Sequence, residues 1–153
     1  METTLSRLQV WPLWQKAKRF TISTVHEDAA TGARAEEFCQ MLAKSLVRTP
    51  EISKELWLLP ELRTPQLRAI AAQEAAAADL VIISVHHAEA LPKEIKLWID
   101  LCVKQRGNRP GVLLAIFDPP YLGSSSSIQA CLHEVAQRGH MEFLARSEEK
   151  LAD

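Results

Sequence analysis

The sequence predicts an α/β fold of three layers, in which a doubly wound, parallel sheet of five strands in the order 2-1-3-4-5 lies between helices. Two observations predict it. Strand-like and helix-like segments alternate along the chain, and crossovers of this length connect parallel neighbours in a right-handed sense. Residues 80–85 and 111–117 are apolar without alternation, which is typical of strands that helices cover on both faces. As the third and fourth strands, they take interior places in that order.

The first two strands and the helix between them have local signals. Residues 19–25 alternate polar and apolar side chains, as a strand does. Asp28 is expected to cap the first helix, whose apolar residues recur at steps of three and four until Pro50. Residues 55–59 form a short second strand that Pro60 ends.

The second helix is expected to begin with Thr64 as its cap and Pro65 as its first residue, a favoured pairing. It is rich in alanine and runs to about Ala78. Its inward-facing residues are expected to be Leu67, Ile70 and Ala71.

The remaining elements have clear ends. The third helix opens at Pro92 and stops at Gly107, because glycine commonly terminates helices. Ser126 fits a capping box at the start of the fourth helix, which ends at Gly139. Residues 141–145 are expected to form the last strand, at an edge of the sheet.

Three segments organise the chain: an N-terminal arm (residues 1–18), the α/β domain (residues 19–146) and a charged tail (residues 147–153). The arm holds Trp11 and Trp14, and a tryptophan can bury about 200 Å². We therefore expect the arm to pack on the domain or on a partner chain.

The composition fits one globular domain, since the 153 residues are 47% hydrophobic and 24% charged. A net charge of -1 gives no overall field that attracts nucleic acid, which is therefore not an expected partner. No apolar run approaches the ~20 residues of a membrane span, and no secretory signal pattern is present, so we expect a cytoplasmic protein. Three cysteines fall on apolar helix faces, where they are expected to be buried thiols rather than zinc ligands.

Most candidate site residues follow strands one and three, which flank the point where the winding reverses and where ligands bind in such sheets. Asp118 lies at the same rim, after strand four. Carboxylates and imidazole there can hold a divalent metal. The metal candidates are Glu27, Asp28, His86 and Asp118, and His26, His87 and Glu89 lie in the same loops. A second interpretation is that these residues are polar because loops are exposed, with Asp28 serving as a helix cap.

Cofactor-binding candidates stand at helix starts, because amides at helix N-termini favour anions. They are Thr31 and Gly32 in the first helix and Ser124 before the fourth. The chain has no GxGxxG or Walker-type motif, so the pattern identifies no particular cofactor.

The order of elements over residues 19–146 resembles the receiver domain of two-component signalling, and more broadly flavodoxin-like domains. Glu27 and Asp28 stand where receivers have an acidic pair. The third strand ends in Ser84-Val85-His86-His87, where receivers have a phospho-accepting aspartate. The resemblance is therefore to a small, degenerate receiver-like bacterial domain, and it implies signalling through partners without aspartyl phosphorylation.

A second resemblance involves residues 78–84 and the helix that follows them, residues 91–98. This pattern is similar to short bacterial proteins of unknown function and to nucleoside-processing and TIR-type domains, in which an Ala-Asp-apolar strand precedes a helix with a glutamate. The resemblance implies a catalytic role for Glu94.

Two functions follow as hypotheses. The first is a non-catalytic protein-interaction or signalling domain that binds a protein partner or forms a homo-oligomer. The alternative is a small nucleotide- or metal-binding enzyme at the rim of strands one and three, with Glu94 and His86 as catalytic candidates. Flavin stacked on Trp57 and Tyr121 is a further option. The sequence leaves open which cofactor, if any, is bound.

Overall fold

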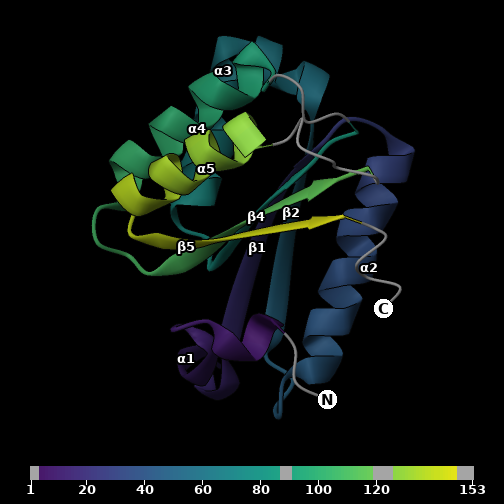
Figure 1. Ribbon diagram of the computed structural model, residues 1–153, viewed down its shortest axis with the longest axis vertical. Coiled ribbons are helices and arrows are strands. Elements are labelled where there is room, and N and C mark those ends of the chain that lie inside the picture. Colours follow the sequence, from purple (N-terminus) through teal and green to yellow (C-terminus); the bar gives the residue numbers. More distant parts are fainter. Residues whose placement is uncertain (1–3, 87–90, 119–125, 148–153) are drawn as a thin grey trace.

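The computed structural model describes residues 4–86, 91–118 and 126–147, and it contains a parallel five-stranded sheet in the order β2-β1-β3-β4-β5 (Figure 1). The strands are β1 (Arg19–His26), β2 (Glu51–Leu58), β3 (Leu80–Ser84), β4 (Gly111–Phe117) and β5 (Met141–Ser147). The α-helices are α1 (Trp11–Lys16), α2 (Ala29–Ser45), α3 (Pro65–Ala76), α4 (Lys93–Arg106) and α5 (Ser126–Arg138). The 3₁₀ helices are η1 (Thr4–Arg7) and η2 (Leu59–Arg63). The predicted fold class and strand order are confirmed.

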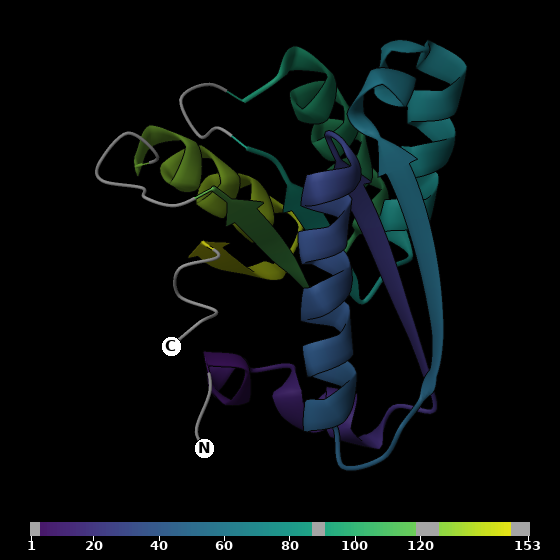
Figure 2. The ribbon, with the colours of Figure 1, turned by 90° about the vertical axis from the view of Figure 1, so that its right-hand side faces the viewer.

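The helices form two layers, one on each face of the sheet (Figures 1 and 2). Helices α3, α4 and α5 pack on one face, in a core that includes the fully buried Trp98. Helix α2 packs on the other face, together with η1 and α1. Successive residues of β3 and β4 alternate between these cores, and both strands are wholly buried, as their apolar runs predict. This is the three-layer arrangement of flavodoxin-like folds.

The N-terminal segment belongs to the second core. Trp14 is 4% exposed and packs edge-to-face on Phe20 of β1, with ring centroids 4.8 Å apart. The carboxylate of Glu142 in β5 accepts the backbone N–H groups of Gln9 (2.8 Å) and Val10 (3.0 Å), just before α1. The arm therefore packs on the domain, and the Trp14 side chain offers no surface to a partner in this arrangement.

Two predicted details are wrong. Strand β2 begins at Glu51 rather than at residue 55, because its pairing with β1 starts at Arg19 and continues through the polar residues Ser53 and Lys54. In α3, Ile70 is 46% exposed and the buried face consists of alanines: Ala71, Ala72, Ala75 and Ala76. Helix packing there depends on small side chains that allow close approach, so the larger isoleucine lies outside.

The helix ends follow the expected chemistry. Asp28 caps α2, and Gly107 ends α4 with a φ of 62°. Thr64 is the N-cap of α3, although its side chain makes no capping hydrogen bond. Burial raises the pKa of the Cys39 and Cys102 thiols to about 11, so both are protonated at neutral pH.

Within the three described stretches, no helix has both the length and the apolar character needed to cross a membrane.

Candidate functional site

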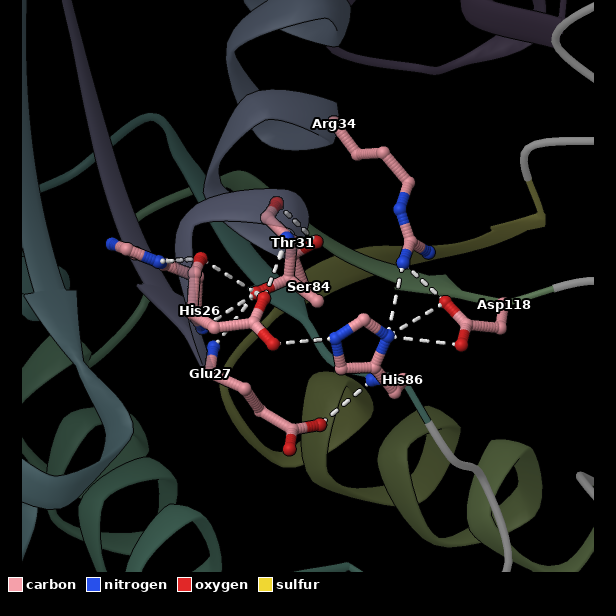
Figure 3. Close-up of polar contacts among 8 residues, drawn as sticks. His26, Glu27, Thr31, Arg34, Ser84, His86 and Asp118 are labelled. Carbon is pink, nitrogen blue, oxygen red and sulfur yellow. Dashed lines mark hydrogen bonds and ion pairs between the residues drawn. The ribbon is translucent and has the colours of Figure 1, made fainter.

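The described candidate residues at the carboxyl ends of β1, β3 and β4 lie together at one rim of the sheet (Figure 3). Parallel pairing brings these strand ends to the same edge, and backbone hydrogen bonds extend the pairing past β3 and β4. Val85 donates to the carbonyl of Ile116 (3.0 Å), and Asp118 donates to the carbonyl of His86 (3.1 Å). The strand order reverses between β1 and β3, so these loops border the point where ligands bind in such sheets.

His86 is at the centre of this group. Its Nδ1 lies 2.9 Å and 3.0 Å from the two carboxylate oxygens of Asp118, and its Nε2 lies 2.7 Å from Oδ2 of Asp28. An ionised carboxylate can only accept hydrogen bonds, so the two carboxylate contacts favour a proton on each ring nitrogen. A hydrogen bond from Nη2 of Arg34 on α2, which lies 3.2 Å from Nδ1, would instead need that nitrogen unprotonated. Hydrogen bonds to the carboxylate of Asp28 and then to that of Asp118 raise the pKa of His86 above 6.5. The geometry therefore favours an imidazolium held between two carboxylates.

Arg34 of α2 adds a second cation, which the sequence analysis missed. Its side chain is 8% exposed, and its Nη2 forms an ion pair with Oδ1 of Asp118 and lies 3.2 Å from Nδ1 of His86. The available signal was helical spacing, because Thr31, Arg34, Ala35 and Phe38 form one buried stripe of α2. An arginine on that stripe has to face the sheet or its rim. We call Asp28, Arg34, His86 and Asp118 the rim network.

Asp28 is both a helix cap and a member of the rim network. Its Oδ1 accepts the backbone N–H of Thr31 (3.0 Å), while the Thr31 hydroxyl accepts the N–H groups of Glu27 (2.9 Å) and Asp28 (3.0 Å). The other carboxylate oxygen, Oδ2, lies 2.7 Å from Nε2 of His86. The Thr31 amide, followed by His86, lowers the pKa of Asp28 from 3.8 to about 2. Asp28 thus caps α2 with one carboxylate oxygen and contacts His86 with the other.

Glu27 binds the main chain beside the rim network. Its Oε1 accepts the backbone N–H of His86 at 2.7 Å, so the carboxylate fixes the main chain after β3 rather than the imidazole ring. Ser84 fixes the opposite side of this junction, where its hydroxyl donates to the carbonyl of Thr31 at 2.7 Å. These bonds fasten α2 to the end of β3.

Metal binding requires several donors that face one point. Among the residues that the structure places, no three His, Cys, Asp or Glu side chains are arranged in this way. The reason lies in the imidazole, because Nδ1 and Nε2 point away from each other and put the carboxylates of Asp118 and Asp28 on opposite sides of the ring. A metal site formed by Glu27, Asp28, His86 and Asp118 stays a prediction.

The cofactor candidates in α2 have structural roles. Thr31 is fully buried within the cap, and Gly32 leaves room for a histidine ring, since a Cβ there would lie 2.9 Å from Nδ1 of His26. That Nδ1 lies 2.9 Å from the carbonyl oxygen of Asp28. Contact of Thr31 or Gly32 with a cofactor stays a prediction, and Ser124 lies outside the described residues.

The other candidates lie elsewhere or outside the described residues. Glu94 is in the first turn of α4, where its carboxylate accepts a hydrogen bond from Nε of Arg63 at 3.2 Å. Trp57 is half-buried and donates from Nε1 to Glu74 of α3 at 2.7 Å. The described part of the chain does not include His87, Glu89 and Tyr121.

The rim network makes stability depend on pH with a definite sign. A raised His86 pKa means that its stabilisation is complete below the ordinary value of 6.5 and is lost as the pH rises through the raised pKa. A lowered Asp28 pKa means that its stabilisation is present above 3.8 and is lost as the pH falls toward about 2. The network is therefore complete in the weakly acidic range, between pH 3.8 and 6.5.

The comparisons with known proteins add no family. No protein-family model matches the chain, and a search of curated proteins finds no similar sequence.

Proposed function

We propose that the chain is a non-catalytic, receiver-like domain that acts in signalling by binding a protein partner or a second copy of itself. The observation that carries this proposal is the placement of His86 near the end of β3, where the receiver resemblance places a phosphoryl acceptor. Both its ring nitrogens face carboxylates. A doubly protonated imidazole has no lone pair, so it can neither attack phosphorus nor take a proton from a substrate.

Mutual compensation of charge supports the same proposal. The side chains of His86 and Arg34 both contact the carboxylate of Asp118. The carboxylate of Asp28 contacts Nε2, on the other side of the imidazole ring. A ligand that needed these carboxylates would first have to break ion pairs that the protein makes internally. The network also joins the ends of β1, β3 and β4, so it can hold the loops of an interaction surface in one arrangement.

The alternative, a nucleotide- or metal-binding enzyme at this rim, is separated from the proposal by ligand screening. The full chain is incubated with acetyl phosphate and Mg²⁺, and its intact mass is measured by mass spectrometry. Its thermal unfolding midpoint is measured separately with Mg²⁺, Mn²⁺, nucleotides and flavin. We expect no phosphoryl adduct and no ligand-dependent shift that requires Asp28 and His86. A ligand at 100 times its Kd stabilises by about 2.7 kcal/mol, which would raise the midpoint by roughly 5 °C or more.

The decisive control is the double variant Asp28→Ala with His86→Ala. A phosphoryl adduct in the native chain, or a ligand-induced shift that this variant abolishes, would reject the proposal, and the shift would favour the alternative of ligand binding at this rim. Sedimentation of the native chain over a range of concentrations tests the self-association branch, for which we expect a reversible rise in mass.

A further inference from the structure

A second charged group lines a hollow of about 240 Å³ between η2, α3 and α4, and it shares no residue with the rim network. Three of its five lining residues are cations, although the whole chain has a net charge of -1. The lining residues are Arg63, Arg68, Lys93, Glu94 and Leu97. Such a local excess of positive charge raises the concentration of anions at the hollow.

The three cationic residues come from three different elements that meet at the hollow. Arg63 is the last residue of η2, and Lys93 is the first residue of α4. Arg68 of α3 donates from Nη1 to the carbonyl of Leu62 at 2.9 Å, and Leu62 is completely buried. This bond anchors the Arg68 side chain, which also lines the hollow.

One anionic side chain of the protein, Glu94, already lines the hollow. The Glu94 carboxylate accepts its own backbone N–H in the first turn of α4 and a hydrogen bond from Nε of Arg63 at 3.2 Å. The amide comes first among the contacts that lower the pKa of Glu94, followed by Arg63. The Arg63 side chain is 69% exposed and that of Glu94 is 26% exposed, so a dissolved anion can reach and replace this contact.

We propose that this hollow binds a small phosphate monoester, whose phosphate pairs with Arg63, Arg68 and Lys93 in competition with the Glu94 carboxylate. Arginine forks match phosphate oxygens in pairs, and lysine adds a point charge. Leu97 is 39% exposed at the same hollow and supplies an apolar wall for the organic part of the ligand. The site adds a small-molecule ligand to the proposed function and does not depend on it.

The test is an NMR titration of the full chain with phenyl phosphate at constant ionic strength, with chloride as the matched salt. We expect saturable shifts of the Arg63 and Arg68 Nε–H signals and of the Lys93 and Glu94 backbone amides. Arg63→Met should weaken binding at least tenfold, because charge-assisted hydrogen bonds to phosphate are lost. Arg138→Met, which removes an exposed arginine on α5, should leave the affinity unchanged.

Glu94→Gln separates competition from mere proximity. It keeps the size of the side chain and removes its charge, so phenyl phosphate should bind about tenfold more tightly. Chloride that reproduces the shifts, shifts that do not saturate, or a Glu94→Gln variant with unchanged or weaker binding would each overturn the proposal. A failure here leaves the rim network untouched, because Asp28, His86 and Asp118 are not part of the hollow.

Discussion

Asp118→Asn is expected to lower the free energy of unfolding by about 2 kcal/mol at pH 7. The substitution keeps the size of the side chain but removes the charge that faces Arg34 and His86. Breaking a buried ion pair costs about 3–5 kcal/mol, because the remaining charge is left without its counter-ion in a poorly solvated place. The Arg34 side chain is buried, but that of Asp118 is 33% exposed. Water around Asp118 therefore reduces the cost. Urea unfolding of both proteins measures the difference.

The control for this prediction is Asp100→Asn. Asp100 also pairs with an arginine, Arg138 at 3.3 Å, but both side chains are well exposed, at 37% and 54%. Exposed pairs contribute little, so we expect a change within about 0.5 kcal/mol. If Asp118→Asn costs no more than Asp100→Asn, the rim network does not stabilise the fold.

Arg106→Met is expected to cost about 3 kcal/mol. Arg106 is 4% exposed, and its guanidinium donates to carbonyls at the end of α3 and in the loop before β4. The best-placed acceptors are the carbonyls of Ala75 (3.0 Å), Ala78 (2.8 Å) and Pro110 (2.9 Å). Methionine fills much of the same space and donates no hydrogen bond, and each buried acceptor that loses its donor costs about 1–3 kcal/mol. Burial lowers the pKa of Arg106, and relief from that desolvation offsets part of the loss.

Lys104→Met is the matched control on the same helix. Lys104 is exposed, and its replacement removes the same charge, so the free energy of unfolding should change by no more than about 0.5 kcal/mol. Equal effects of Arg106→Met and Lys104→Met would show that the helix-end carbonyls find other donors, which would contradict this account of the α3–β4 junction.

The layout of the sheet could be predicted because its physical signals are local. The runs from residue 80 and from residue 111 have no polar face, which places them at the centre, and the order 2-1-3-4-5 then brings the loops after β1, β3 and β4 to one rim. Asp28 was predicted as a cap for the same kind of local reason.

The charge pairing at the rim could not be predicted, because it depends on which side chains a fold brings within reach. Arg34 is one of many charged residues on predicted helices, and only its burial beside Ala35 and Phe38 distinguishes it. The ring of His86 could have faced solvent, a metal or a carboxylate, and the choice rests on the positions of Asp28 and Asp118, which are 58 and 32 residues away in sequence. The inward face of α3 was misjudged because hydrophobicity favoured Ile70, whereas close packing favoured its alanines.

The most direct test of the central claim, that His86 is an imidazolium clamped between Asp28 and Asp118, is a ¹⁵N NMR titration of the histidine side chains. His86→Gln identifies the signals. We predict that the His86 ring titrates at a pKa above 6.5, with both Nδ1 and Nε2 protonated below that pKa. A ring that titrates at or below 6.5 would contradict the claim.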